Sequence, residues 1–505
     1  MGEKTAIVAP SSIADSVITP EWVKDAIFYQ IFPDRFAKST HVEKPYNLES
    51  WDAPPTTYGF KGGDLLGVVE HLDYLTALGV DALYFCPIFQ STANHRYHTH
   101  DYYQVDPLLG GNAVFRRLLD TAHRRGIRIV LDGVFNHASR GFYQFNHTLE
   151  NRTASPYLNW FSFHDFPLHA YDDLGPSGYA AWWNLKALPK FNHANPQVRA
   201  FLLRVAEYWV EQGIDGWRLD VPAEIDDDDF WRTFRRRIKA KNPEAYIVGE
   251  IWQRADRWLV GDQFDAVMNY QFTRACLGFF IDMDEEAQAM TRGHSYGKLT
   301  SCDARQFAQH LETALTWYPS EIAYAQLNLI NSHDTARFLT LAKGDTSAVK
   351  LAYLIMMTYP GVPMIYYGDE VGLAGGRDPD CRRAMPWDPC TWNRELLAAV
   401  KKYIVLRKKY TSLWWRGAYT RLYTQGKVYV FARQRAPHTV LIGVNAGTSS
   451  VQLDLDVHRL LPNGTTVYDE WGGQQYPVTA GQVRGLTIPA RQGGAWAAHL
   501  ACNQA

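Results

Sequence analysis

The 505-residue sequence has few of the features that mark a metal-binding, disulfide-rich, membrane or secreted protein. It contains only six cysteines, scattered without the spacing of metal ligands, so we expect reduced thiols. It has no apolar run near the roughly 20 residues that a membrane span requires. Its N-terminus has no apolar stretch of signal-peptide quality. These absences predict a soluble, cytoplasmic protein without a disulfide framework.

An excess of charge of either sign is also absent. The chain has 51 basic and 53 acidic residues, a net charge of −2. This balance gives no electrostatic reason to expect binding to nucleic acid or to an anionic membrane. What the sequence has in abundance is aromatic: 17 Trp, 29 Tyr and 24 Phe make up 14% of the chain. Flat apolar rings with polar edges suit sugars, although they also build cores.

Short runs of β-branched and aromatic residues alternate with helix-period segments between residues 26 and 410. The eight runs are AIFYQIF (26–32), DALYFCP (81–87), IRIVLDGVF (127–135), IDGWRLD (214–220), AYIVGEI (245–251), FDAVMNY (264–270), AQLNLINS (325–332) and VPMIYYG (362–368). The helical segments include 66–79, 114–126, 198–213, 228–241 and 346–359. Eight strand-then-helix units predict an α/β fold, a (β/α)8 TIM barrel rather than a doubly wound sheet.

Two parts of the chain depart from this alternation. Nearly sixty residues, rich in Asn, His, Pro, Tyr and Trp, separate the third strand from the next helix. A long connection of this kind on a barrel is usually functional. Beyond Tyr410, short alternating segments with Gly and Asn turns predict a C-terminal antiparallel β-sandwich. We therefore predict a catalytic barrel over 1–137 and 195–410, an inserted domain over 138–194 and a β domain over 411–505.

Polar residues follow several of the predicted strands, at the face of a barrel where chemistry takes place. They are Asp132, Asn136 and His137 after the third run, Arg218 and Asp220 in the fourth, Glu250 in the fifth, and His333 and Asp334 after the seventh. Any one of these carboxylates alone is more often a helix cap or an ion-pair partner. Together they suit acetal cleavage, which needs one protonated and one ionised carboxyl group. We expect Asp132 to organise hydrogen bonds rather than react.

Four segments resemble the strand-end motifs of the α-amylase family of glycoside hydrolases. They are DGVFNH (132–137), GWRLDVPAE (216–224), GEIW (249–252) and NSHDT (331–335), in the family's order and on the expected strands. The resemblance covers nearly the whole chain and implies a retaining mechanism. It implies Asp220 as nucleophile, Glu250 as general acid/base, and Asp334 as the carboxylate that holds and distorts the sugar at the cleaved bond.

The same resemblance implies the substrate-binding residues. Arg218 matches the residue that orients the nucleophile, and His137 and His333 match ligands of the sugar hydroxyls. Tyr97 resembles the tyrosine whose ring stacks beneath that sugar, and Trp252 resembles an aromatic platform on the leaving-group side. The aromatic rings that we expect to meet sugars are Tyr97, Phe135, Trp182, Trp183 and Trp252.

Finer matches indicate one branch of the family. LPKFN (188–192) resembles the MPKLN signature of neopullulanases, cyclomaltodextrinases and maltogenic amylases, and not the QPDLN of oligo-1,6-glucosidases. In DPDCRR (378–383), Asp378 and Arg382 are similar to residues that hold sugars on the non-reducing side. Glu224 also fits this branch, whose members often accept α-1,6 linkages and transfer glycosyl groups.

The sequence departs from this branch in several places. Only about 25 residues precede the first strand, where the branch usually carries a β domain that helps form dimers, so we expect a monomer or a weak homo-oligomer. VPAE (221–224) replaces the usual VANE, and His98 replaces Asp. The loop 35–52 lacks the Asn/Asp array that binds calcium in several relatives, although Asn136 and Asp64 remain. Because such sites need six or more oxygens, we expect no required cofactor, with structural calcium as the alternative.

These observations lead to a hypothesis with two alternatives. The leading one is a retaining hydrolase that cleaves α-1,4-glucosidic bonds in maltooligosaccharides, cyclodextrins or pullulan, with transglycosylation expected. Cleavage of α-1,6 bonds is left open. The first alternative is an exo-acting α-glucosidase or glucosyltransferase of the same family. A catalytically silent sugar-binding relative is the second, and it is disfavoured because Asp220, Glu250 and Asp334 are all present. The only partner expected is an α-glucan oligosaccharide, with no nucleic acid and no membrane.

Overall fold

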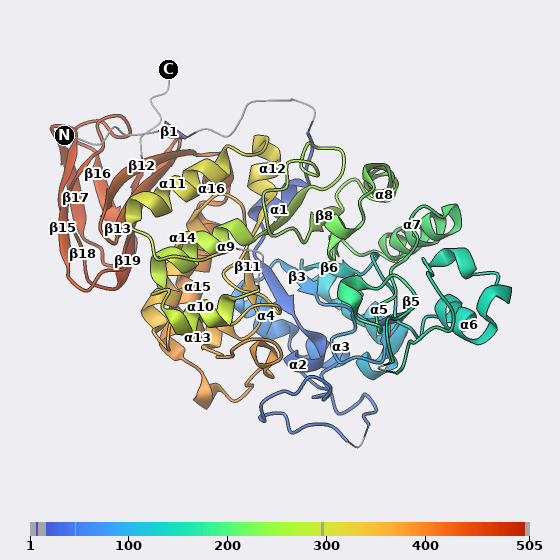
Figure 1. Cartoon of the computed structure of the whole chain (residues 1–505). Coiled ribbons are helices and arrows are strands. Elements are labelled where there is room, and N and C mark those ends of the chain that lie inside the picture. Colours follow the sequence, from blue (N-terminus) through green and yellow to red (C-terminus); the bar gives the residue numbers. More distant parts are fainter. Residues whose placement is uncertain (1–6, 9–16, 46, 173, 294–296, 500–505) are drawn as a thin grey trace.

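The computed structural model describes residues 7–8, 17–45, 47–172, 174–293 and 297–499. Figure 1 shows a barrel in the middle of the molecule, a β domain at one end, and the segment that carries α6 (Tyr143–Asn151) at the other. The described part of the chain contains no helix that combines the length and the apolar character needed to cross a bilayer. The five cysteines within it are free thiols, and Cys502 lies outside the described residues.

Eight parallel strands close into the barrel, in the order β10-β11-β2-β3-β6-β7-β8-β9. They are β2 (Phe28–Ile31), β3 (Ala82–Phe85), β6 (Arg128–Gly133), β7 (Gly216–Leu219), β8 (Tyr246–Gly249), β9 (Ala266–Asn269), β10 (Leu327–Asn328) and β11 (Val362–Tyr366). Each lies within its predicted range, so the predicted TIM barrel is confirmed. Nearly every residue of these strands is buried, as is expected where side chains fill the barrel on one side and helices cover it on the other.

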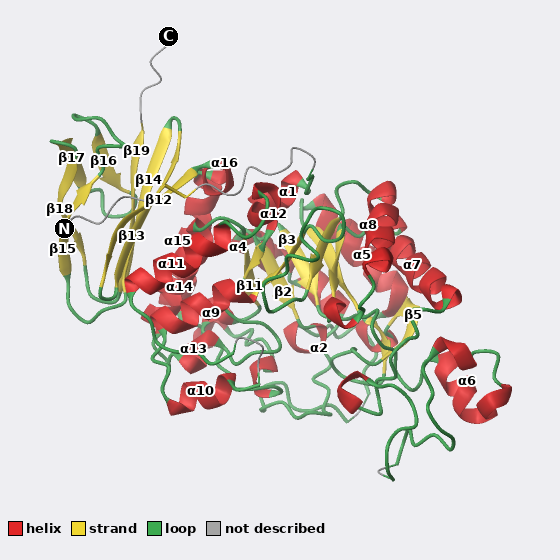
Figure 2. Cartoon of the chain, turned by 45° about the horizontal axis from the view of Figure 1, so that its top comes forward, coloured by secondary structure: helices red, strands yellow, loops and turns green. Residues whose placement is uncertain are grey.

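Helices cover the outside of the barrel (Figure 2). The larger ones are α5 (Gly111–Arg124), α7 (Pro196–Glu211), α8 (Asp228–Lys241), α9 (Tyr270–Phe280), α11 (Ala304–Leu315), α14 (Thr346–Thr358) and α15 (Arg394–Lys409). Shorter ones are α1 (Glu21–Asp25), α2 (Pro33–Phe36), α3 (Leu65–Glu70), α4 (Leu72–Leu78), α10 (Glu285–Thr291), α12 (Ser320–Ala325), α13 (Phe338–Leu341) and α16 (Thr411–Arg416).

Local chemistry explains where these helices begin and end. Helix α8 starts where the Asp227 side chain accepts the Phe230 N–H, and it ends with Lys239 and Lys241 near the negative end of the helix dipole. Its bounds are those predicted. The predicted helix 66–79 is instead broken at His71, whose backbone leaves helical geometry and whose imidazole contacts the Gly67 carbonyl.

The insertion between β6 and α7 is held by a few bridges and an aromatic core. Isolated antiparallel bridges join His137 to Lys190 and Ala181 to Pro189, so the end of the insertion returns to the barrel beside its beginning. Phe142 and Phe161 are buried in its core. A short hairpin, β4 (Phe89–Ser91) and β5 (Thr99–Val105), lies in the connection after β3.

The C-terminal domain is an antiparallel sheet of nine strands with its own core. Its strands are β1 (Ile7–Val8), β12 (Ala418–Gln425), β13 (Val428–Arg435), β14 (His438–Asn445), β15 (Val451–Asp456), β16 (Thr466–Asp469), β17 (Gln475–Thr479), β18 (Gln482–Ile488) and β19 (Gln492–His499). A separate apolar cluster joins β13 and β14 to β15 and β18 at the far end of the strand order. The sheet therefore curls over itself, and the predicted all-β C-terminal domain is confirmed.

Candidate active site

Three carboxylates from three strand ends meet at one arginine. Arg218, on β7, donates from Nη1 to Asp132 at 2.9 Å and to Asp220 at 3.0 Å. Its Nη2 lies 3.0 Å from Glu250 Oε2. Arg218 precedes Asp220 by two residues, so both side chains leave the strand on the same face. The strands β6, β7 and β8 thus deliver Asp132, Asp220 and Glu250 to a single guanidinium.

Glu250 is fixed on both carboxylate oxygens. Its Oε2 accepts the backbone N–H of Val221 at 3.1 Å, and its Oε1 accepts the Trp252 indole N–H at 3.2 Å. Val221 has φ 35° and ψ 50°, the left-handed region, which is strained for a β-branched residue. This strained turn directly follows Asp220 and directs the Val221 N–H toward Glu250. It thereby fixes the position of the Glu250 carboxylate relative to that of Asp220.

A second set of contacts surrounds Asp132 and His333. The hydroxyls of Tyr84 and Tyr97 donate to Asp132 Oδ2 at 2.8 and 3.0 Å. The Tyr97 hydroxyl also contacts His333 Nε2, and the two rings are nearly parallel at 5.5 Å. The Gln30 amide contacts the other ring nitrogen, Nδ1, at 2.8 Å. Tyr97 therefore lies in contact with two of the predicted strand-end residues, Asp132 and His333.

Arg382 connects Asp334 with Asp378. Its Nη2 lies 3.2 Å from Asp334 Oδ1, and its Nη1 lies 2.9 Å from Asp378 Oδ1. Its Nε donates to the His333 carbonyl at 2.8 Å. Asp334 Oδ2 lies 3.2 Å from His333 Nε2. These residues join the carboxylate cluster through His333, on the side where Tyr97 lies.

The charge balance of the cluster favours retention of a proton. Burial raises the pKa of Glu250 to about 6, with Asp334 adding to the rise and Arg218 opposing it. Burial also raises the pKa of Asp220 well above its ordinary value; Arg218 opposes this rise, and the charges of Glu250, Asp132 and Asp334 add to it. Three buried carboxylates share one cation, so they titrate as a group.

The two histidines are neutral near pH 7. Burial lowers the pKa of both His137 and His333 to about 3. His137 Nδ1 contacts the Asn136 amide at 3.1 Å, and its buried Nε2 has no hydrogen-bond partner among the described residues. Neutral imidazoles next to carboxylates can donate to or accept from sugar hydroxyls without changing the charge of the site.

Two further predicted residues lie at the edge of the cluster. Glu224 is exposed and its Oε2 pairs with Lys190 Nζ at 3.0 Å. Trp252 is half-buried, and its ring lies flat on Tyr270, with centroids 3.6 Å apart and an angle of 2° between the planes. Its indole N–H reaches Glu250, so this aromatic face adjoins the carboxyl predicted to serve as acid.

One prediction about a sugar-facing ring is wrong. Phe135 is only 1% exposed and packs against Trp217 and Phe234, in the layer between the barrel and α8. Conversely, sequence reasoning did not find Gln30 or Tyr84, which lie opposite each other on β2 and β3 and contact the site. Gln30 and Tyr84 could have been found from the sequence, because each carries a polar group within an otherwise apolar strand-like run.

Of the two residues considered for calcium, Asp64 has other partners, whereas Asn136 keeps its oxygen unpaired. Asp64 caps α3, accepts the Ser39 N–H and pairs with Lys44. The side-chain nitrogen of Asn136 contacts His137, and its buried Oδ1 has no hydrogen-bond partner among the described residues. Within the described ranges, no three His, Cys, Asp or Glu side chains are grouped as metal ligands would be.

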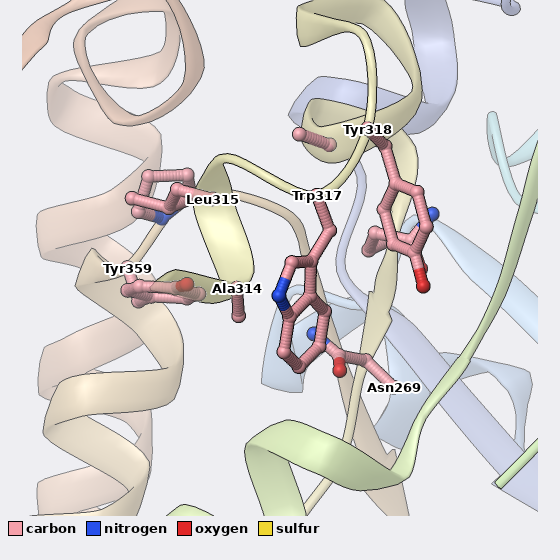
Figure 3. A pocket seen from close by; sticks show the side chains of 9 residues that line it. Asn269, Ala314, Leu315, Trp317, Tyr318 and Tyr359 are labelled. Atoms are coloured by element: carbon pink, nitrogen blue, oxygen red, sulfur yellow. The ribbon is translucent and has the colours of Figure 1, made fainter. Parts of the chain in front are cut away.

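Two cavities lie apart from the carboxylates. The smaller one is lined by Trp317, Asn269 and Tyr359 among others (Figure 3). It adjoins a cavity of about 550 Å³ between α9 and α11. Neither is lined by Asp220, Glu250 or Asp334. Both cavities are therefore separate from the carboxylate cluster.

Comparison with known proteins identifies the family of the chain. The family model of the α-amylase catalytic domain matches residues 30–431, and that of the neopullulanase-like C-terminal domain matches 419–497. A Bacillus cyclomaltodextrinase is 47% identical over 396 residues, covering 78% of this chain and 67% of that enzyme. Neopullulanase 2 of Thermoactinomyces vulgaris is 43% identical over 480 residues, covering 94% and 78% respectively. The native structure of the Nostoc punctiforme debranching enzyme is 48% identical, with a TM-score of 0.86 and coverage of 95% of this chain and 99% of that one.

Proposed function

This chain belongs to the α-amylase family of glycoside hydrolases, and from that premise we propose that it hydrolyses α-1,4-glucosidic bonds of maltooligosaccharides, cyclodextrins or pullulan with retention of configuration. The observation that carries the proposal is the shared contact of Asp220 and Glu250 with Arg218, beside Asp334. A retaining glycosidase needs two carboxyl groups close together, one ionised and one protonated. The likeness to a neopullulanase and a debranching enzyme extends the proposal to α-1,6 bonds.

The first chemical step uses both carboxyl groups. Glu250 donates its proton to the glycosidic oxygen, while Asp220 attacks the anomeric carbon and the bond to the leaving sugar breaks. The product is a glycosyl ester on Asp220 and a free leaving sugar. Arg218 holds Asp220 as an anion before the attack, and the strained Val221 turn keeps Glu250 in place.

The second step restores the enzyme. Glu250, now a carboxylate, takes a proton from water, whose oxygen attacks the anomeric carbon and releases Asp220. A sugar hydroxyl in place of water would give transglycosylation. We assign Asp334, with Arg382 and His333, to the hydroxyls of the bound sugar, and the ring of Tyr97 to its lower face. Asp378 extends this surface on the non-reducing side.

The pKa of Glu250 predicts how activity depends on pH. The reaction requires Glu250 protonated and Asp220 ionised, so kcat/KM will fall as pH rises through about 6, where Glu250 loses its proton. Initial rates on maltotriose from pH 4 to 9 measure this. Because the cluster titrates as a group, the pKa read from this fall in kcat/KM belongs to Glu250 and Asp220 together. A rate that stays constant from pH 6 to 9 would contradict the assignment.

A panel of substrates tests the proposed function. β-Cyclodextrin, pullulan, starch and maltotriose are incubated in parallel with the wild-type enzyme, and products are followed in time. We expect maltooligosaccharides from cyclodextrin opening and from cleavage inside chains. Glucose as the sole first product would indicate the exo-acting alternative, and no cleavage of any of the four would refute the proposal.

A further inference from the structure

The cavity of about 550 Å³ between α9 and α11 (the α9–α11 cavity) is lined by a face of each helix. On α9, Gln271, Arg274 and Gly278 are spaced by three and four residues, so they share one face. The α11 side has polar residues at a similar helical spacing: Gln306, Gln309, His310 and Thr313. A volume of this size lies within the range of about 300–1,000 Å³ that is typical of small-molecule sites.

The α9–α11 cavity has basic side chains in its lining and no acidic ones. Arg274, His310 and Lys298 line it, whereas no Asp or Glu of the described residues does. This absence is local, since the whole chain has 53 acidic and 51 basic residues. Burial and the charge of Arg274 both lower the pKa of His310, and no carboxylate of the described chain opposes them. A negative charge placed between Arg274 and His310 would therefore stabilise the charged form of both.

The segment 298–302, which forms one wall of the cavity, is fixed to the rest of the fold. Its backbone packs directly on α9 at Gly278, where a Cβ would lie only 2.9 Å from the Thr300 carbonyl oxygen. The Cys302 N–H donates to the Gly278 carbonyl at 2.7 Å. Lys427, in the turn between β12 and β13, donates to the Cys302 carbonyl at 2.9 Å. The wall is therefore held by α9 and the C-terminal domain together, so the cavity is preformed.

Trp317 lies where the α9–α11 cavity meets the smaller one. With Asn269, Ala314 and Tyr359 it lines both cavities. Figure 3 shows its indole between Ala314 and Asn269. The side chain is half-buried, so part of the ring remains accessible. A flat indole beside amide side chains suits a sugar, whose ring has an apolar face and whose hydroxyls bind amides.

We propose that the α9–α11 cavity binds a phosphorylated sugar, with the phosphate between Arg274 and His310 and the sugar ring toward Trp317. The guanidinium can offer two parallel N–H donors to phosphate oxygens, and Lys298 adds a further cation for a dianion. This site goes beyond the proposed function and does not depend on it, because none of the three strand-end carboxylates assigned to the reaction lines the cavity.

Isothermal titration with glucose 6-phosphate tests the site, with inorganic phosphate and glucose titrated in parallel at constant ionic strength. We expect glucose 6-phosphate to bind, inorganic phosphate to bind about fivefold more weakly, and glucose to give no binding at the same concentrations. The titration of glucose 6-phosphate is repeated on Glu250→Gln saturated with maltoheptaose. Unchanged affinity there would place the ligand outside the active site, whereas competition with maltoheptaose would overturn the assignment.

Matched variants identify the groups that hold the phosphate. Arg274→Ala should weaken glucose 6-phosphate binding about tenfold, because a charge-assisted contact is lost, and His310→Ala should weaken it as well. Arg236→Ala removes an exposed cation from α8, outside the cavity, and should leave the affinity unchanged. All three side chains are exposed, so the fold should persist, which thermal unfolding curves check.

Several results would overturn the assignment: no binding of glucose 6-phosphate to the wild type, undiminished binding in Arg274→Ala, or an equal loss in Arg236→Ala. Equal affinity for glucose 6-phosphate and inorganic phosphate would overturn the place given to the sugar ring. Failure of the proposed function would show differently, as a wild-type enzyme that cleaves no maltotriose and still binds glucose 6-phosphate.

Discussion

Replacing Asp220 by Ala is expected to lower kcat on maltotriose by more than about 10⁴-fold, because no nucleophile remains to form the glycosyl ester. Arg218 keeps Asp132 and Glu250 as partners, so the fold should persist. A thermal unfolding curve checks this. The isosteric Asp220→Asn should be equally slow, because the amide is a poor nucleophile.

Azide distinguishes loss of the nucleophile from general damage. In Asp220→Ala, azide can occupy the vacated space and displace fluoride from α-maltosyl fluoride, forming a carbon–nitrogen bond with inversion. We expect β-maltosyl azide, identified by NMR, and a rate that rises with azide concentration. Rescue that yields the α-azide, or activity of the unrescued variant near that of wild type, would refute the role of Asp220.

Replacing Glu250 by Gln is expected to lower kcat on maltotriose by about 10²- to 10⁴-fold, because the amide cannot protonate the leaving oxygen. Gln matches Glu in shape and retains an oxygen to accept the Val221 N–H, so oligosaccharide binding should be retained. Isothermal titration with maltoheptaose measures that affinity.

The leaving group provides the control for Glu250. Fluoride departs without a proton, so formation of the glycosyl ester from α-maltosyl fluoride should be slowed far less than cleavage of maltotriose. The limb of the pH profile near 6 should also disappear for this substrate. Equal losses on both substrates would show that Glu250 does not act as the acid.

Much of the fold follows from local pattern. The eight strands are buried apolar runs, and the Asp227 cap with its C-terminal lysines defines α8. The break at His71 and the shortness of β10 do not follow from pattern. The first depends on a side-chain contact with the Gly67 carbonyl, and the second on Ala325 ending a helix just before the strand.

The residues of the site also divide into those that could be predicted from the sequence and those that could not. Asp220, Glu250 and Asp334 could be predicted because strand ends of a barrel converge and their motifs are ordered along the chain. Phe135 was assigned wrongly because, past the end of β6, alternation no longer fixes which way a ring points. The strain at Val221 and the stacking of Trp182 on His137 depend on contacts between distant segments, which no sequence pattern reports.

The anomer first released from a substrate tests the central claim most directly. Wild-type enzyme is mixed with maltotriose in D₂O and followed by proton NMR before mutarotation equilibrates the products. Double displacement through Asp220 and Glu250 predicts that the new reducing end formed at the attacked carbon appears first as the α-anomer. Early accumulation of the β-anomer would contradict the mechanism, and with it the roles assigned to the two carboxyl groups on Arg218.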